Sequence, residues 1–123
     1  MDIKQFEDIW NGQIDTEKSV LLKRAEAYAT GGNRLGNFYE GAALNQSTPM
    51  EYGFALVTKH IIALRDLIDK LSKGEGAYNG NESARFFEYV TDIRNYSILL
   101  KALYIEERNR LNSNSPVEIG MEL

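Results

Sequence analysis

Two carboxylates one helical turn apart are the strongest candidates for chemistry in this sequence. Glu88 and Asp92 are four residues apart and therefore share one face of any helix that contains both. Tyr89 and Tyr96 lie on the same side of that helix as Asp92, beside an apolar stripe, so the Asp92 carboxylate is partly desolvated. A carboxylate that stays ionised in such a place needs a cation. Lys59 or Arg65 could supply it, and so could a hard divalent ion such as Mg²⁺.

A structural role for Asp92 is the alternative. In that role, Asp92 pairs with a lysine or arginine across a helix interface and fixes the register of two helices. Asn95, three residues on, joins Asp92 as a candidate ligand-binding residue. The lone His60 borders an apolar stripe and is interpreted as a packing or interface residue. A binding site and a register pair both remain open interpretations of Asp92.

A second candidate site combines Arg24 with the glycine-containing segment over residues 31–38. Its glycines permit close approach of the backbone to a ligand, and Arg24, Arg34 and Asn37 supply donors suited to phosphate. The segment is not a P-loop, because it lacks the Gly-Lys-Ser/Thr ending and follows a helix instead of a strand. The alternative is a loop that only turns the chain.

Start and stop signals predict the helices that must position these residues. The predicted helices cover residues 17–29, 35–44, 49–73 and 82–111. Asp15 or Thr16 is the expected cap of the first of them, and the glycine pair Gly31-Gly32 is expected to end it. The clearest start is Thr48-Pro49, where Glu51 completes a capping box, and Asn81 is the expected cap of the last helix. Four apolar residues favour a further short helix at the start of the chain: Ile3, Phe6, Ile9 and Trp10.

No segment shows the period-two alternation of a strand between turn signals, so the fold class predicted is all-α. We expect an antiparallel helical bundle with two long and two or three short helices. Residues 1–111 would form one helical domain, and residues 112–123 a loose C-terminal tail.

An apolar stripe with alternating spacings of four and three runs along the helix over residues 49–73. Its members are Met50, Phe54, Val57, Ile61, Leu64, Ile68 and Leu71. This heptad pattern is typical of helix pairing. The stripe on residues 82–111 is longer than its expected neighbours can cover. We therefore expect a homo-oligomer, most simply a homodimer that completes a four-helix core.

Composition and charge narrow the range of partners. The 123 residues include no cysteine and one histidine, which excludes a disulfide scaffold, a thiol nucleophile and a cluster of imidazole ligands. A net charge of -4 argues against duplex nucleic acid, but residues 18–73 carry eight cations and five anions, which favours an anionic small molecule. Neither a secretory signal nor an apolar run of bilayer length is present, so we expect a cytoplasmic protein without a membrane partner.

The order of the short motifs is similar to that of a known group of proteins. It runs Arg24-x-x-x-Tyr28-x-x-Gly31-Gly32-Asn33, Asn37-Phe38, a Thr48-Pro49 helix that contains Lys59, and Asp92-Ile93-x-x-Tyr96. This order resembles small, mostly phage-borne helical families of unassigned or nucleotide-modification-associated function. Those families in turn resemble the all-α nucleoside triphosphate pyrophosphohydrolases of the MazG type. The resemblance covers about residues 20–105.

The resemblance implies an oligomeric helical bundle in which Mg²⁺, held by acidic residues on two helices, binds a triphosphate. Asp92 matches the acid of the late helix, Glu88 its upstream carboxylate, and Lys59 the helix lysine that contacts phosphate. The Glu-x-x-Glu motif of the catalytic families is absent, since residues 54–65 hold no carboxylate. We therefore expect binding of a nucleotide or related phosphorylated small molecule, with weak or no pyrophosphohydrolase activity.

In this interpretation Arg24, Arg34 and Lys59 bind phosphate, and Tyr89 or Tyr96 stacks on or borders the base. The rival interpretation is a phage-encoded protein that inhibits or redirects a host protein, docking through its apolar helix faces without a small ligand. A purely structural oligomer is a third, since it needs only the heptads.

Overall fold

The protein is all-α, as the sequence predicts. The computed structural model describes residues 1–25, 32–76, 78 and 80–113, of which 83% are helical and none forms a strand. The helices are α1 (Ile3–Lys23), α3 (Gly36–Leu44), α4 (Pro49–Ser72) and α5 (Gly80–Leu111). The predicted tail beyond residue 113, and Tyr28 and Gly31 of the motif order, lie outside the described residues.

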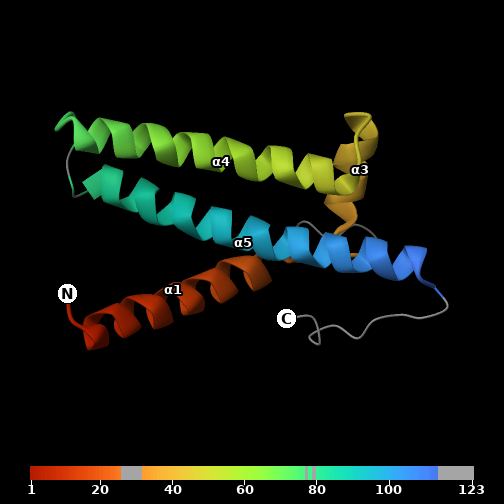
Figure 1. Ribbon diagram of the computed structural model, residues 1–123, viewed down its shortest axis with the longest axis horizontal. Coiled ribbons are helices and arrows are strands. Elements are labelled where there is room, and N and C mark those ends of the chain that lie inside the picture. The colour runs from red at the N-terminus through yellow and green to blue at the C-terminus, as the bar shows by residue number, and fades with distance from the viewer. Residues whose placement is uncertain (26–31, 77, 79, 114–123) are drawn as a thin grey trace.

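The two long helices, α4 and α5, form an antiparallel hairpin (Figure 1). The predicted capping box at the start of α4 is confirmed: the Glu51 backbone N–H donates to Thr48 Oγ1 at 3.1 Å, and the Thr48 N–H donates to Glu51 Oε1 at 2.9 Å. Asn81 is not the cap of α5, because the helix already begins at Gly80 and places Asn81 in its first turn.

One continuous helix, α1, replaces the two helices predicted for the first 29 residues, and that prediction is wrong. Asp2 caps α1, with its Oδ1 accepting from the Gln5 N–H at 2.8 Å and Gln5 Oε1 accepting from the Asp2 N–H at 2.8 Å. The hydroxyl of Thr16, an expected cap, instead donates back to the Gly12 carbonyl at 3.0 Å and so belongs to the helix interior. The helix ends at Lys23, well before the expected glycine pair.

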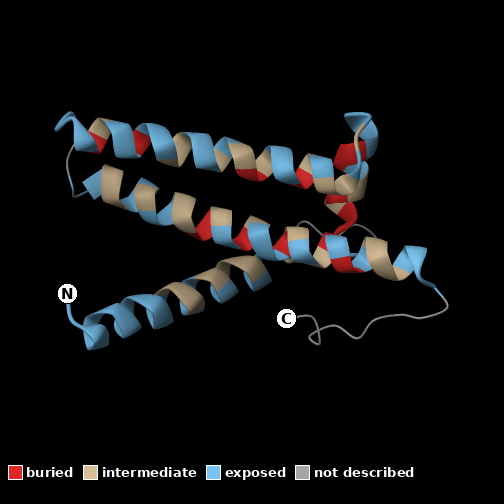
Figure 2. Cartoon of the chain, viewed as in Figure 1, coloured by how far each residue is buried: buried red, intermediate tan, exposed pale blue. Residues whose placement is uncertain are grey.

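Helix α5 lies between α4 on one side and α1 on the other, and the short helix α3 crosses one end of the α4–α5 hairpin (Figure 1). The hydrophobic core sits where α3 meets that hairpin. Its buried members are Leu35, Phe38, Leu99 and Leu103. Figure 2 shows buried residues concentrated on α3 and the middle of α5, whereas the first half of α1 is exposed. The packed part of the molecule is therefore the end that carries α3.

Close packing of α3 on α4 depends on a glycine. A Cβ added at Gly41 would lie 2.3 Å from ring carbons of Tyr52, so only glycine lets the ring take this place. The Tyr52 ring then meets the Phe38 ring edge-on, with centroids 6.5 Å apart and planes at 77°. The two aromatic rings form a fixed wall between α3 and α4.

Part of the predicted heptad stripe of α4 is left uncovered. Val57 and Leu71 are buried, but Phe54, Ile61 and Ile68 are 63%, 47% and 45% exposed. The three exposed side chains are spaced by seven residues and form a second stripe along the outside of α4, called the α4 outer stripe below. Among the described residues, no helix combines the length and apolar character needed to cross a membrane.

Candidate functional site

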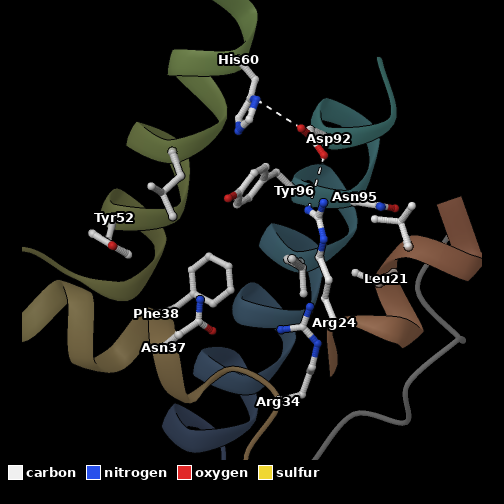
Figure 3. Close-up of a pocket in the computed structure, with 13 residues that line it drawn as sticks. Leu21, Arg24, Arg34, Asn37, Phe38, Tyr52, His60, Asp92, Asn95 and Tyr96 are labelled. Carbon is white, nitrogen blue, oxygen red and sulfur yellow. Dashed lines mark ion pairs between the residues drawn. The ribbon is translucent and has the colours of Figure 1, made fainter. Parts of the chain in front are cut away.

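A cavity of about 310 Å³ lies between four parts of the chain (Figure 3). They are the end of α1, the start of α3 with the residues just before it, helix α4, and helix α5. Its apolar wall includes Leu21, Phe38, Leu56 and Leu99. Its polar wall includes Arg24, Arg34, Asn37, His60, Asp92 and Asn95. The volume is at the lower end of the range of small-molecule sites, about 300–1,000 Å³, and a mainly apolar lining with a few convergent polar groups is typical of them.

Six of the nine predicted site residues line this one cavity, although they come from three separate segments of the chain. They are Arg24, Arg34, Asn37, Asp92, Asn95 and Tyr96. Lys59, Tyr89 and Glu88 do not line it. Lys59 and Glu88 are exposed, and Tyr89 lies two turns before Tyr96 on the same helix. The two candidate sites predicted from the sequence are therefore two sides of a single cavity.

The Asp92 carboxylate is at the centre of the polar wall and contacts two other parts of the chain. The residue is only 8% exposed. Its Oδ1 lies 3.8 Å from Arg24 Nη1, and its Oδ2 lies 3.5 Å from Nδ1 of His60 (Figure 3). The cation beside Asp92 is thus Arg24 and not the expected Lys59. Lys59 directly precedes His60 on α4, and because successive residues are turned by about 100° around a helix, the two side chains leave the helix on different sides.

The second half of α1 is held on α5 by polar contacts that place Arg24 over the cavity. Gln13 Nε2 donates to Thr91 Oγ1 at 3.0 Å, and Asn95 Nδ2 donates to the Glu17 carbonyl at 3.4 Å. Arg94 of α5 forms an ion pair with the Glu17 side chain. Since all these contacts lie within two turns of Asp92, they fix the cavity wall that α1 and α5 share.

Two buried polar atoms in the wall lack hydrogen-bond partners. Arg34 Nη1 and Asn37 Oδ1 are both shielded from solvent, and neither is hydrogen-bonded within the described part of the chain. Figure 3 shows the two side chains at the same end of the cavity, opposite His60. An unpaired buried donor or acceptor costs about 1–3 kcal/mol, so such atoms indicate a missing partner. Two guanidinium groups against one carboxylate make the cavity suited to an anion.

The donor set does not fit a divalent ion held by Glu88 and Asp92 alone. Within the described ranges, no three histidine, aspartate or glutamate side chains gather as a metal-binding group. Glu88 is exposed, and the two Asp92 oxygens face Arg24 and His60. Mg²⁺ prefers several oxygen ligands and retains water. The Mg²⁺ ion predicted at Glu88 and Asp92 stays a prediction.

A separate hydrogen bond ties α3 to the end of α5. The Tyr39 hydroxyl donates to Glu106 Oε1. This bond, helped by partial burial of the phenol, raises the pKa of Tyr39 to about 12. Because Phe38 is the neighbour of Tyr39, the bond also helps to fix the α3 side of the cavity.

Comparison of the chain with protein-family models, with curated proteins and with solved structures finds no match in any of the three. The resemblance to MazG-type proteins and to phage-borne families therefore stays a prediction, and the site has to be interpreted from its own geometry.

Two cavity residues with polar atoms in their side chains, His60 and Tyr52, are not among the predicted site residues. His60 was interpreted as a packing residue, and Tyr52 was not singled out. Both follow a signal in the sequence: Tyr52, Leu56 and His60 are spaced by four and therefore share one helix face. That face carries polar atoms on both sides of a leucine, which distinguishes it from the heptad stripe of the same helix.

Proposed function

We propose that this protein binds a small phosphorylated molecule, of mononucleotide size, in the cavity between α1, α3, α4 and α5. The observation that supports this best is the pair of unsatisfied buried atoms, Arg34 Nη1 and Asn37 Oδ1, in a wall with an excess of positive charge. A phosphate oxygen would accept from Arg34 and a ligand hydroxyl or N–H would donate to Asn37.

The remainder of the cavity suits a flat, partly apolar group. Phe38, Tyr52 and Tyr96 supply aromatic surface, and the His60 ring lies beside Tyr96 with centroids 5.3 Å apart. A nucleobase stacks favourably on such rings. Asn95 and Asp92 offer polar atoms at the same end, which would bond to the edge of a base.

In this proposal the ligand is bound with weak or no pyrophosphate release. The residues that the MazG-type families use to hold metal have no counterpart on α4 between residues 54 and 65. Cleavage at a triphosphate would then lack its usual neutralising ion. Mg²⁺ would enter with a nucleotide and contact Asp92, while Glu88 and Lys59 lie outside the cavity lining.

Isothermal titration calorimetry tests the proposal. The full chain is titrated with nucleoside mono- and triphosphates, with Mg²⁺ or with EDTA, and pyrophosphate release is measured in parallel. We expect saturable binding to one site per chain, weakened in Arg34→Gln but not in Lys73→Gln. Lys73 is a suitable control because it is an exposed cation whose partner is Asp69 on the surface of α4. No heat with any nucleotide would overturn the proposal.

We also propose that a second copy of the chain covers the α4 outer stripe. Phe54, Ile61 and Ile68 recur every seven residues, which is the spacing that lets two helices pair along their length. The resulting homodimer, or a higher homo-oligomer, would remove three large apolar side chains from water. Sedimentation equilibrium distinguishes it from a monomer.

Docking to another protein, such as a host protein if the chain is phage-encoded, is a second candidate function. It is favoured by the first half of α1, where every residue from Met1 to Gly12 is exposed, Phe6 and Trp10 included. An amphipathic helix of this kind fits a hydrophobic groove. Pull-down with the full chain and with a Phe6→Ala/Trp10→Ala variant tests it: a protein recovered in stoichiometric amount by both chains alike would contradict docking through α1.

A further inference from the structure

We propose that Asn37 makes the cavity selective for a nucleoside 5′-monophosphate with a free 3′-hydroxyl group. The inference deepens the proposed function and rests on it, because the ligand is the phosphorylated molecule assigned there. It names a hydrogen-bond donor that the ligand must carry beside its phosphate, and it makes Asn37 a specificity-determining residue. Arg34, in contrast, binds the phosphate of any such ligand.

The side-chain oxygen of Asn37 is shielded from solvent and accepts no hydrogen bond within the described part of the chain. Other asparagines nearby have structural partners. Asn33 Oδ1 accepts from the Leu35 N–H at 3.0 Å. Asn45 Nδ2 donates to the Gly41 carbonyl at 2.7 Å. Asn37 lies in the first turn of α3, whose start has no side-chain cap among the described residues, so its buried carbonyl has no structural role there.

The backbone around Asn37 is held in place before any ligand enters. The Gly36 N–H donates to the Asn33 carbonyl at 3.0 Å. The Phe38 N–H donates to the Leu35 carbonyl, also at 3.0 Å, and the Phe38 side chain is only 1% exposed. Asn37 thus presents its side chain from an anchored backbone, which limits the ordering cost of binding.

A phosphate group does not satisfy the Asn37 oxygen. A carbonyl oxygen only accepts hydrogen bonds, and the oxygens of an ionised phosphate are acceptors as well. Arg34 Nη1, at the same end of the cavity, is the unpaired buried donor that suits the phosphate (Figure 3). A ligand that satisfies both atoms therefore carries a donor close to its phosphate.

In a nucleoside 5′-monophosphate that donor is the 3′-hydroxyl group. His60 lies at the end of the cavity opposite Arg34 and Asn37, and its ring is beside that of Tyr96 (Figure 3). A base stacked on these rings directs the sugar and the phosphate towards the two unpaired atoms. The 3′-hydroxyl is on the sugar carbon next to the one that carries the phosphate arm, whereas the 2′-hydroxyl is on the carbon next to the base. The 3′-hydroxyl is thus the donor that reaches Asn37 Oδ1.

Asn37 discriminates because the wrong ligand leaves its oxygen unpaired. A 3′-deoxynucleotide still brings phosphate to Arg34 but keeps Asn37 Oδ1 buried without a donor. A site built to pair with a hydroxyl rejects the analogue that lacks it, since the desolvated group stays unsatisfied. A 2′-deoxynucleotide keeps the 3′-hydroxyl, so the cavity accepts ribose and deoxyribose alike.

Isothermal titration calorimetry on the wild-type full chain tests the inference. The four ribonucleoside 5′-monophosphates are titrated first, and the one that binds most tightly is compared with its 2′-deoxy and 3′-deoxy forms. We expect the 3′-deoxy form to bind about 10- to 100-fold more weakly, and the 2′-deoxy form to bind within about 3-fold of the parent. A 3′-deoxy form that binds as tightly as the parent, or a 2′-deoxy form that binds as weakly as the 3′-deoxy form, overturns the inference and leaves the proposed function intact.

Asn37→Leu separates recognition of the hydroxyl from a structural role. Leucine is similar in size to asparagine but has no polar atom, so this variant should bind the parent and the 3′-deoxy form within about 3-fold of each other. A structural Asn37 would weaken both ligands by the same factor, and that result overturns the inference. Asn11→Leu, on the exposed first half of α1, is the matched control and should keep the wild-type ratio of affinities. If no nucleotide binds the wild-type chain, the inference and the proposed function fail together.

Discussion

Asp92 Oδ2 of α5 lies 3.5 Å from His60 Nδ1 of α4, inside a cavity that neither helix forms alone. The same carboxylate faces Arg24 beyond the end of α1 at 3.8 Å. The two interpretations that the sequence left open for Asp92 are therefore compatible, since one residue joins the helices and lines the cavity. Measurements of stability and of ligand binding are needed to separate the two roles.

Replacing Asp92 by asparagine should change stability little. Its partners are partly exposed, with the Arg24 side chain at 50% and the His60 side chain at 29%, so neither charge is stranded when the carboxylate is removed. We expect a loss of at most about 1 kcal/mol in the free energy of unfolding, measured by urea denaturation. A loss above about 3 kcal/mol would show that Asp92 serves chiefly as a structural pair.

Arg34→Gln should weaken the binding of a nucleoside monophosphate by about 10- to 100-fold, because a hydrogen bond to a charged group contributes about 1.5–3 kcal/mol. The folded protein should be as stable or more stable, since the substitution removes a buried donor that has no partner. Calorimetric titration gives the affinity and thermal unfolding gives the stability. Unchanged affinity would place the phosphate elsewhere.

Gly41→Ala should destabilise the fold and disturb the cavity together. The new Cβ would lie 2.3 Å from the Tyr52 ring, which must shift from its contact with Phe38. Overpacking of this kind costs about 1–3 kcal/mol. Gly12→Ala is the matched control, because a Cβ at Gly12 has nothing within 4 Å and the site is in the interior of α1. Equal stability of the two variants would be inconsistent with the packing described.

The hydrogen bond from Tyr39 to Glu106 should make stability fall at alkaline pH. The folded-state pKa of Tyr39, about 12, is above its ordinary value of 10.0, so folding favours the protonated phenol. Its contribution is complete below pH 10 and is lost as the pH rises from 10 towards 12. Denaturation of wild type and Tyr39→Phe across this range isolates the effect from that of other groups. Parallel curves for the two proteins would contradict it.

Ile61→Asp should dissociate the proposed homodimer without unfolding the chain. Ile61 lies in the middle of the α4 outer stripe and is 47% exposed in the single chain, so an aspartate there remains solvated in the monomer but faces its counterpart in an apolar interface. Sedimentation equilibrium should give a monomer mass, with an unchanged helical circular dichroism signal. A wild-type chain that is already monomeric contradicts the proposal.

Much of the fold could be predicted from local signals. The Thr48-Pro49-Met50-Glu51 start defined α4 because it satisfies the free amides of the first turn within four residues. The division of the first 29 residues was wrong because Asp15 and Thr16 are capping types that also occur inside helices. The true cap, Asp2 with Gln5, lies at the very start of the chain.

Most of the polar residues of the candidate site could be predicted from the sequence, but the contacts between them could not. Arginines, asparagines and Asp92 stood out by charge and spacing, but the pairing of Asp92 with His60 and Arg24 depends on how α1 and α4 rotate against α5. That rotation is set by long-range contacts such as Gln13 with Thr91, 78 residues apart, which no local pattern encodes. The same rotation leaves Lys59 and Glu88 on the outside.

The location of the ligand is the central claim, and an NMR titration tests it most directly. The ¹⁵N-labelled chain is titrated with a nucleoside monophosphate while the side-chain amide signals of Asn37 and Asn95 and the ring signals of His60 are followed. These groups line the cavity from α3, α5 and α4. The account predicts that the three sets of signals shift together and saturate at one ligand per chain. Shifts confined to surface residues such as Lys73, or no shift at all, would contradict it.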